Sequence, residues 1–358
     1  MRAIRILLPA LASALAALGA CGGTDVVTGA SSSTTAGSTA GTTTGAGGTT
    51  GAGGSSTSTT SSAGGGGAGG GTTTTTTTTS STTGAGGSPM PVGCVTDVSA
   101  GHHVLPCAGG ITYDLDIPAA CASGGCGLVL DMHGFTMNAD AEEKGTNMRA
   151  LGAQHGYVII QPTAPGVPPS WTQPVHVPLV FSFVNDVAQA LLTDPNRAHV
   201  MGFSQGGGMT WRMVCDHADF FASAAPIGGL EGCEFTGVEQ PSREVPILQV
   251  HGRKDNIVNF GAVAVPQRDA ALAFWNDGPG MVLEEDGAHK ATRYLSPGGT
   301  PLEFWEHDYQ AGSFILGGHC FPGGMDVGQS PFQFGCAELG TFVFGQKAME
   351  FFLAHPKG

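Results

Sequence analysis

The fold of this chain is decided by one short stretch, Gly202-Phe-Ser-Gln-Gly206. It matches the G-x-S-x-G pattern of a nucleophile elbow, a sharp turn between a strand and a helix that lifts a serine hydroxyl above a sheet. The run Arg197–Phe203 predicts the strand, and Met209–Cys215 predicts the helix. A chance match is the alternative in a chain with 59 glycines. The position between a strand and a helix favours the elbow, with Ser204 as a nucleophile.

Short apolar runs alternate with longer amphipathic runs along residues 90–358, which is the pattern of β-α-β units around a largely parallel sheet. The predicted strands are Ile111–Ile117, Gly127–Met132, Tyr157–Gln161, Arg197–Phe203, Ala222–Ile227, Pro246–Val250 and a final pair at Arg293–Leu295 and Leu302–Trp305. The predicted helices are Asn138–His155, Phe181–Leu192, Met209–Cys215, Ala270–Trp275 and Phe342–Leu353. The proline-rich segment Ala164–Pro178 is predicted to be a loop. This order predicts an α/β fold, with a mostly parallel sheet flanked by helices.

An activated serine needs a base, and the base needs an orienting carboxylate. In hydrolases with such an elbow, the acid and then the histidine follow the serine along the chain. Asp255 comes soon after the predicted strand Pro246–Val250, where this kind of fold places its acid. The alternative is a turn aspartate, which the pair Asp255-Asn256 would also suit. We predict Asp255 as the acid.

Four histidines follow Asp255 and are candidates for the base: His289, His307, His319 and His355. His319 lies in the glycine-rich loop Gly317–Gly324, which can place an imidazole over the sheet, and a disulfide at Cys320 would hold it there. The other three lie in polar or strand-like stretches or in the C-terminal tail. We predict His319 as the base.

Two backbone amides are predicted to stabilise an oxyanion. One belongs to Gln205, directly after the nucleophile, and the other to Phe135, in the loop after the second predicted strand. The histidines His133 and His251 are interpreted as packed, hydrogen-bonded residues rather than catalysts. Trp171 either lines the substrate pocket or covers the core beneath the proline-rich loop. Both interpretations stay open, and Trp171 is carried forward as a candidate substrate-binding residue.

Six short segments taken together are more specific than the elbow alone: Asp131–Gly134, Asn185–Val187, Val200–Gly207, Ala222–Gly229, His251–Asp255 and Gly317–Gly323. In this order they resemble the secreted esterases of the polyhydroxybutyrate depolymerase family, which includes feruloyl and acetyl-xylan esterases. The resemblance implies an α/β-hydrolase fold and ester hydrolysis without a cofactor or metal. It also implies a triad of Ser204, Asp255 and His319. Depolymerases of this family often add a substrate-binding domain, and this chain ends soon after its last predicted helix, which puts attack on solid polyester in doubt.

The chain is predicted to have three parts. Residues 1–20 carry Arg2 and Arg5 followed by an apolar run too short to span a bilayer, which predicts a signal peptide. Leu18-Gly-Ala-Cys21 resembles a bacterial lipobox, so Cys21 is a predicted lipidation site; an ordinary cleavable signal that meets a cysteine is the alternative. Residues 21–89 are almost wholly Gly, Thr, Ser and Ala, which predicts a disordered tether. Residues 90–358 form the predicted catalytic domain.

The predicted catalytic domain is strongly acidic. Because Arg2, Arg5 and Asp25 are the only charged residues before it, it holds 12 basic and 27 acidic side chains, a net charge of −15. Such a surface repels nucleic acid and anionic lipid. We therefore expect an ester substrate, no nucleic-acid partner and membrane contact only through the lipid anchor. We expect a monomer located outside the cell or in the cell envelope.

Eight cysteines lie in the same part of the chain. With an export signal ahead of them, disulfides are the default. No Cys-x-x-Cys or His-x-x-x-His pair accompanies them, which argues against a common zinc site. Eight cysteines allow 105 connectivities. Our working hypothesis pairs neighbours: 94–107, 121–126, 215–233 and 320–336.

Two other functions stay open. A surface-binding lipoprotein could keep the hydrolase scaffold without catalysis, and the long tether would suit it, but that function predicts a missing triad residue. A peptidase is the third alternative, because fold and triad alone do not exclude amide cleavage. The natural ester also stays open among short hydroxyalkanoate, feruloyl and acetyl esters.

Overall fold

A computed structural model describes residues 87–358, apart from 238, 239, 339 and 341. The predicted signal peptide, Cys21 and nearly all of the tether lie outside the described residues. Within the described part, ten strands form one sheet in the order β1-β2-β4-β3-β5-β6-β7-β10-β9-β8. The strands are β1 (Gly101–Pro106), β2 (Thr112–Ile117), β3 (Gly127–Met132), β4 (Tyr157–Thr163), β5 (Ala198–Phe203), β6 (Ser223–Ile227), β7 (Ile247–Gly252), β8 (Met281–Glu285), β9 (His289–Leu295) and β10 (Pro301–His307). The helices are α2 (Ala139–Thr146), α3 (Met148–His155), α4 (Gln173–Ala190), α5 (Gln205–His217), α6 (Val265–Trp275) and α7 (Phe344–Ala354), with short helical turns η2 (Ala108–Gly110), η3 (Ala119–Cys121) and η4 (Phe260–Ala264).

The centre of the sheet is parallel and its edges are antiparallel. Strands β4, β3, β5, β6, β7 and β10 run in one direction. At the two edges, β2 and β1 and then β9 and β8 pair antiparallel. Parallel strands need crossovers that cover both faces, so central strands are buried on both faces and mostly apolar. Every residue of β3 and β5 is buried. This is the α/β-hydrolase fold, with a mostly parallel sheet flanked by helices, as the sequence predicted.

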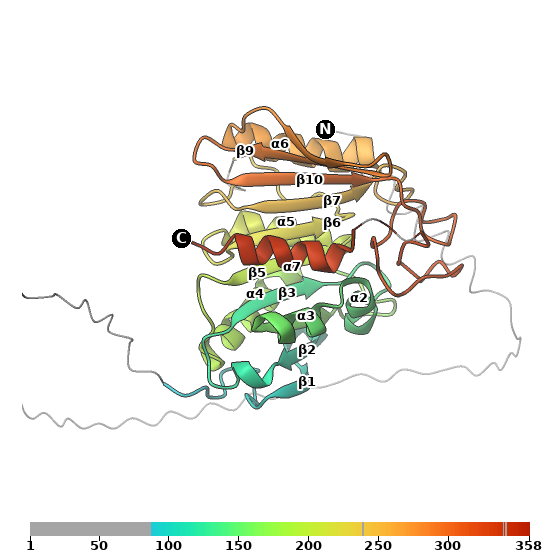
Figure 1. Cartoon of the computed structure of the whole chain (residues 1–358). Helices are drawn as coiled ribbons and strands as arrows, with labels where there is room; N and C mark the ends of the chain where they lie inside the picture. The colour runs from blue at the N-terminus through green and yellow to red at the C-terminus, as the bar shows by residue number, and fades with distance from the viewer. Residues whose placement is uncertain (1–86, 238–239, 339, 341) are drawn as a thin grey trace, which may run out of the picture. The chain divides into compact units, whose positions relative to one another are not determined.

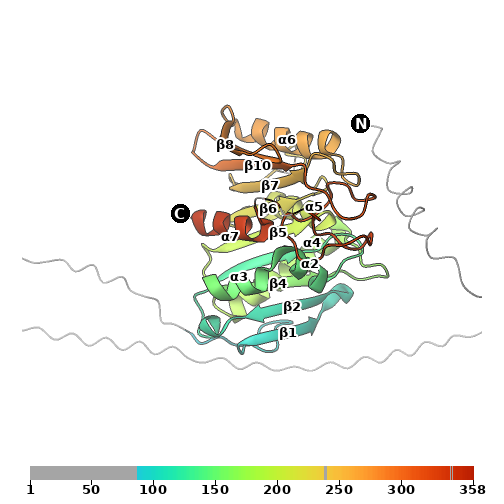
Figure 2. The ribbon, with the colours of Figure 1, turned by 45° about the vertical axis from the view of Figure 1, so that its right-hand side comes forward.

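Helices cover both faces of the sheet. Helices α2, α3 and α7 lie on one face and α4, α5 and α6 on the other (Figure 1 and Figure 2). Successive side chains of a strand point to opposite faces. In β3, Val129 accordingly joins the core beneath α7 with Phe352, while Leu128 and Leu130 join the core beneath α4 and α5. No helix in the described part of the chain is long and apolar enough to cross a bilayer.

The predicted helix Asn138–His155 is in fact two helices. Asn147 adopts a left-handed φ of 53°, which ends α2 before α3 begins. The side chain of Asn138 caps α2 by accepting the N–H of Ala141 over 2.9 Å. Gly156, with φ 71°, ends α3, so the predicted end of the helix at His155 is confirmed. A local backbone reversal at an asparagine therefore divides one amphipathic run.

The loop prediction for Ala164–Pro178 is wrong in its second half, because α4 begins at Gln173. A proline in the first turn is compatible with a helix, since the N–H groups there have no partner within the helix. Pro178 lies deeper in α4 and cannot donate to the preceding turn. Burial of the apolar face of α4, which includes Val177 and Val180, offsets that loss.

Four disulfides join neighbouring cysteines: Cys94–Cys107, Cys121–Cys126, Cys215–Cys233 and Cys320–Cys336. The pairing predicted from the sequence is confirmed. The bridges are local, since the paired residues are 5 to 18 positions apart. Each bridge therefore closes a short segment, and none joins distant parts of the chain.

Candidate active site

Ser204 lies on the sharp turn between β5 and α5, with backbone angles of φ 55° and ψ −113°. A positive φ is uncommon for a residue with a side chain, and such strain costs roughly 1–3 kcal/mol. The Ser204 N–H donates to the Ile227 carbonyl over 3.0 Å, which ties the turn to β6. A Cβ at Gly202 would lie 2.6 Å from the Met132 carbonyl oxygen, and one at Gly206 would collide with the same oxygen. The glycines of the motif are therefore required by the close approach of the turn to β3.

Asp255 lies in the loop after β7, and His319 lies 64 residues later, in the loop that follows β10. Nδ1 of His319 donates to Oδ2 of Asp255 over 2.7 Å. The other oxygen of Asp255 accepts the backbone N–H groups of Ile257 (2.8 Å) and Val258 (2.7 Å). Because both oxygens have donors, the carboxylate has one orientation and the imidazole proton lies on Nδ1. Nε2 of His319 is then the basic nitrogen.

A second imidazole, that of His251, also faces the carboxylate. Its Nε2 lies 2.8 Å from the Val258 carbonyl oxygen and 3.3 Å from Oδ2 of Asp255. Burial by itself would raise the pKa of Asp255, but the charge of His319 and the hydrogen bonds from His251 and His319 outweigh it and hold that pKa below its ordinary value. Asp255 is therefore ionised at neutral pH. His251 is 1% exposed, a packed residue as the sequence predicted.

The imidazole of His319 lies beside the residue that precedes Ser204. Its ring centroid is 4.5 Å from that of Phe203. A Cβ at Gly228 would be 3.3 Å from both rings. Ser204, Asp255 and His319 follow β5, β7 and β10, whose carboxyl ends share one edge of the parallel sheet. The structure thus brings the three predicted residues to one end of the sheet from distant parts of the chain.

The other histidine candidates lie elsewhere. His289 begins β9 and His307 ends β10, and both are fully buried. His355 follows α7, with Nδ1 2.7 Å from the Phe351 carbonyl oxygen. Of the four candidates, His319 is the one that donates to Asp255 within the described part of the chain.

The loop after β3 brings Phe135 close to Ser204. A Cβ at the preceding Gly134 would lie 3.0 Å from the Cβ of Ser204. Phe135 is half-buried, and so is Gln205, the first residue of α5. The two amides predicted as oxyanion donors therefore belong to two segments that both adjoin the serine.

Trp171 lies in the loop between β4 and α4 and is 6% exposed. Its indole N–H donates to the His133 carbonyl over 2.8 Å, and the two ring centroids are 5.0 Å apart. Trp171 therefore packs against the loop that carries Phe135. This position favours the core-covering interpretation of Trp171, and its contact with substrate stays a prediction.

Two carboxyl groups are buried beside the same loop, and sequence reasoning did not single out the second of them. Asp131 of β3 and Glu142 of α2 are both 0% exposed. Oδ2 of Asp131 accepts from Thr146 Oγ1 (2.8 Å) and Gln161 Nε2 (2.9 Å). Burial, followed by the nearby charge of Asp131, raises the pKa of Glu142 well above its usual value. Glu142 therefore keeps its proton to a higher pH than an exposed glutamate does.

Replacing Glu142 with glutamine is expected to flatten the pH dependence of stability. With its pKa raised, Glu142 stays protonated in the folded protein while the unfolded chain ionises above about pH 4.3. The free energy of unfolding then falls by about 1.4 kcal/mol per pH unit until the pKa of the folded state is passed. Glutamine has nearly the same shape as the protonated glutamate and has no titrating proton. Guanidinium unfolding of both proteins between about pH 5 and pH 9 measures the difference.

The control for this exchange is Glu350→Gln, because Glu350 is an exposed glutamate on α7. Its stability should follow the wild-type curve at every pH. Parallel stability–pH curves for the wild type and Glu142→Gln would contradict the raised pKa.

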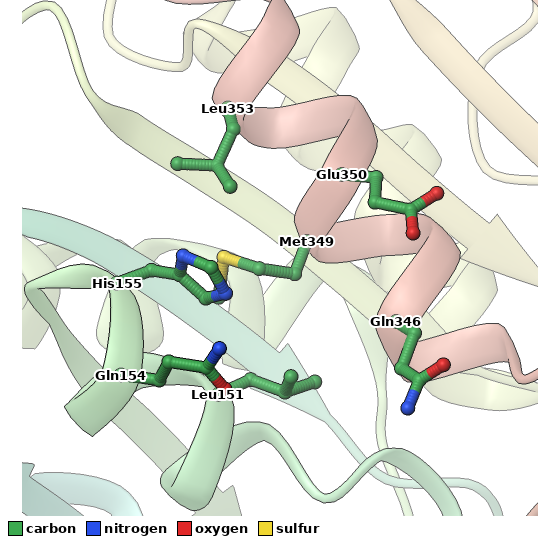
Figure 3. A pocket seen from close by; sticks show the side chains of 7 residues that line it. All are labelled: Leu151, Gln154, His155, Gln346, Met349, Glu350 and Leu353. Carbon is green, nitrogen blue, oxygen red and sulfur yellow. The ribbon is translucent and has the colours of Figure 1, made fainter.

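A hollow between α3 and α7 is separate from this site (Figure 3). The side chain of Met349 on α7 extends toward His155 on α3. The hollow is lined by Leu151, Gln154, His155, Gln346, Met349, Glu350 and Leu353. None of these is a predicted catalytic residue. Across the described residues, no group of three or more His, Cys, Asp or Glu side chains is placed to hold a metal ion.

Comparison with known proteins finds ester hydrolases. The chain is 25% identical over 138 residues to a bifunctional acetylxylan esterase/xylanase of Neocallimastix patriciarum, which covers 38% of this chain and 20% of that protein. It is 28% identical over 143 residues to feruloyl esterase B of Piromyces equi, with coverages of 37% and 27%. It is 34% identical over 116 residues to a poly(3-hydroxybutyrate) depolymerase of Ralstonia pickettii, with coverages of 26% and 23%. The resemblance predicted from the six segments is confirmed.

These similarities cover part of each relative. The chain spans 20%, 27% and 44% of the length of three curated relatives. No protein-family model matches the chain. Among solved structures, an acetyl xylan esterase from Aspergillus awamori aligns with a TM-score of 0.47 and 15% identity, over 58% of this chain and 92% of that one. The activities and substrates of these relatives are therefore only proposed for this chain.

Proposed function

We propose that the protein is a serine esterase that hydrolyses carboxylic esters through an acyl-enzyme. One observation carries the proposal: the 2.7 Å hydrogen bond from His319 to the buried carboxylate of Asp255, at the end of the sheet where a strained turn presents Ser204. A serine on such a turn, a base and an oriented acid in this order are what acyl transfer requires. The names of three relatives support an ester as the bond that is cleaved.

In the proposed mechanism, Oγ of Ser204 attacks the ester carbonyl carbon while Nε2 of His319 takes the hydroxyl proton. The bond to the alcohol then breaks, and His319 returns the proton to the leaving oxygen, so the acyl group stays on Ser204. Water then gives a proton to His319 as its oxygen attacks the acyl carbon. The bond from that carbon to Oγ of Ser204 breaks, His319 returns the proton to Oγ, and the carboxylic acid leaves. Asp255 holds the imidazole in place and stabilises its charged form.

Each tetrahedral intermediate carries a negative charge on the former carbonyl oxygen. Hydrogen-bond donors stabilise it best when they are in position before the reaction begins. The backbone amides of Phe135 and Gln205 are proposed to supply this stabilisation. Both are amides of the main chain, so their placement depends on how firmly the two loops are held.

The protein is further proposed to be exported and anchored through lipid on Cys21. The four disulfides support export, because such bridges persist in oxidising compartments. The signal-like and lipobox-like sequence of residues 1–21 supports the anchor. Detergent-phase partitioning of the full chain tests it: the wild type should enter the detergent phase and Cys21→Ala should not. Equal partitioning of the two would overturn the anchor.

An ester panel with the purified protein tests the proposed function and narrows the substrate class. p-Nitrophenyl acetate, methyl ferulate and a short 3-hydroxybutyrate oligomer represent the ester types named for the relatives. At least one should be hydrolysed, and a fluorophosphonate probe should label Ser204 in the folded protein. Absence of both turnover and labelling would favour the surface-binding alternative.

Opening the Cys320–Cys336 disulfide is expected to lower both stability and turnover. The bridged residues are 16 positions apart, and a bridge across a segment of this length contributes about 3 kcal/mol. Because Cys320 directly follows His319, the added freedom also displaces the imidazole. The double variant Cys320→Ala/Cys336→Ala should therefore show a lower Tm and a lower kcat on the best ester of the panel.

The control is the double variant Cys94→Ala/Cys107→Ala, which opens a bridge between residues 13 positions apart that adjoins none of the proposed catalytic residues. It should lower Tm to a similar extent and leave kcat of the folded protein unchanged. Equal kcat values for the two double variants would show that the Cys320–Cys336 bridge does not position His319.

A further inference from the structure

The loop between β4 and α4 is bonded at three points to the loop after β3. The indole N–H of Trp171 donates to the His133 carbonyl over 2.8 Å. The N–H of Ala164 donates to Nε2 of His133 over 2.9 Å. The N–H of Thr136 donates to the Pro169 carbonyl over 3.0 Å. The two loops therefore form one hydrogen-bonded unit beside the nucleophile.

These bonds determine the direction of the Phe135 amide. Because Nε2 of His133 accepts a backbone N–H, the ring proton lies on Nδ1, which donates to the Gly134 carbonyl over 2.6 Å. Burial lowers the pKa of His133 to about 4, so the ring is neutral at neutral pH. The Gly134 carbonyl and the Phe135 N–H belong to one planar trans peptide and point in opposite directions. Holding that carbonyl therefore holds the first proposed oxyanion donor.

The side chain of Gln205 extends the connection to the second donor. Its Oε1 accepts the backbone N–H of Trp171 over 3.0 Å. Its amide group also lies 3.3 Å from the hydroxyl of Ser170. The backbone N–H of the same glutamine is the second proposed oxyanion donor. Side-chain bonds through Gln205, Trp171 and His133 therefore connect the two donors across the site.

We propose that Trp171 and the side chain of Gln205 are positioning residues. They hold the two proposed oxyanion amides, those of Phe135 and Gln205, in place relative to each other. The inference rests on the proposed esterase function and gives Trp171 a role other than contact with the substrate. Trp171 is 6% exposed, and its indole N–H is engaged by the His133 carbonyl. Placement of this kind matters because a displacement of about 1 Å in an active site can lower the rate on the order of 10²-fold.

The first test is Trp171→Phe, which removes the indole N–H and keeps an aromatic ring. We expect kcat to fall by about tenfold to a hundredfold, with KM within about twofold of the wild type. The loss should be the same for p-nitrophenyl acetate and methyl ferulate, because the lost bond holds the oxyanion loop and not the acyl group.

The matched control is Trp275→Phe. Trp275 is 7% exposed, on α6, and its indole nitrogen has no hydrogen-bond partner among the described residues. This exchange removes the same atoms from another part of the core and should leave kcat unchanged. Thermal unfolding of both variants separates a loss of stability from a loss of turnover.

The second test is a double-mutant cycle with Gln205→Ala. Since both exchanges break the same connection, the double variant should lose about as much kcat as the more damaging single variant. If Trp171→Phe does not fold, Gln205→Ala decides alone, and a wild-type kcat for it overturns the inference.

Three results would overturn the inference and leave the proposed function standing. They are additive losses in the cycle, a change confined to KM, and losses that differ between acetyl and feruloyl esters. The last would make Trp171 a wall of the substrate pocket. A wild type that hydrolyses no ester in the same assay would overturn the proposed function and this inference together.

Discussion

Replacing Ser204 with alanine is expected to reduce kcat on a short-chain p-nitrophenyl ester on the order of 10⁶-fold. Alanine removes the nucleophilic oxygen and keeps the Cβ, so the positive-φ turn retains its packing. Without the hydroxyl no acyl-enzyme forms, and the remaining rate comes from binding and the oxyanion donors alone. Absorbance assays of turnover, together with thermal unfolding of both proteins, measure the loss at constant fold.

The control for this experiment is Ser223→Ala. Ser223 is also fully buried, and its hydroxyl lies 2.8 Å from Nδ1 of His199. It begins β6, so it lies at the opposite end of the parallel sheet from Ser204. Ser223→Ala should lower Tm and leave kcat unchanged. If Ser204→Ala retained wild-type turnover, another group would be the nucleophile and the proposed mechanism would fail.

Replacing Asp255 with asparagine is expected to lower kcat by about 10⁴-fold. The asparagine oxygen can still accept the N–H groups of Ile257 and Val258, which leaves its NH₂ group facing Nδ1 of His319. Nδ1 must then act as an acceptor, and the ring proton moves to Nε2, where it prevents uptake of the serine proton. A pH–rate profile of both proteins measures the loss.

The expected shape of that profile follows from the carboxylate. Because the pKa of Asp255 is held below its ordinary value, the wild-type group stays ionised across the neutral range and the loss should not depend on pH there. The control is Asp308→Asn, which removes the charge that pairs with Arg253 (2.9 Å). Asp308 directly follows β10, at the end of the strand from which the loop with His319 begins. This ion pair is partly buried and includes none of the proposed catalytic residues, so the exchange should change kcat by less than about threefold. An Asp255→Asn protein within about tenfold of the wild type would show that this carboxylate does not orient the base.

Much of the fold was predictable because its signals are local. The central strands β3 and β5 are buried on both faces and appear in the sequence as short apolar runs between turn residues. The disulfides join neighbouring cysteines, so their pairing required no knowledge of distant contacts. The end of α3 at Gly156 followed from the ability of glycine to adopt a positive φ.

The elements that sequence reasoning missed carry weak or contrary local signals. All five residues of the edge strand β8 are exposed, and its apolar stretch is only the three residues Met281–Leu283 before two glutamates. Most residues of β1 are exposed as well, so neither strand has the long apolar run of a buried central strand. Two prolines obscured the first turns of α4, which packing on the sheet stabilises. Strands β1 and β8 pair with the strand that follows each of them, and α4 packs on the sheet, but the periodicity within one segment reveals neither kind of contact.

The candidate site also has features that local sequence predicts and features that only tertiary contacts determine. The sequence alone was enough to predict Ser204 as the nucleophile, since the glycines and the flanking strand and helix of an elbow are all within a few positions of it. It also predicted Asp255 and His319 by their order along the chain. The bond between them, the burial of Trp171 against His133 and the raised pKa of Glu142 required the folded protein. A residue pattern reports which face of an element is buried, whereas the partner that meets that face is determined by the packing of the sheet, helices and loops in three dimensions.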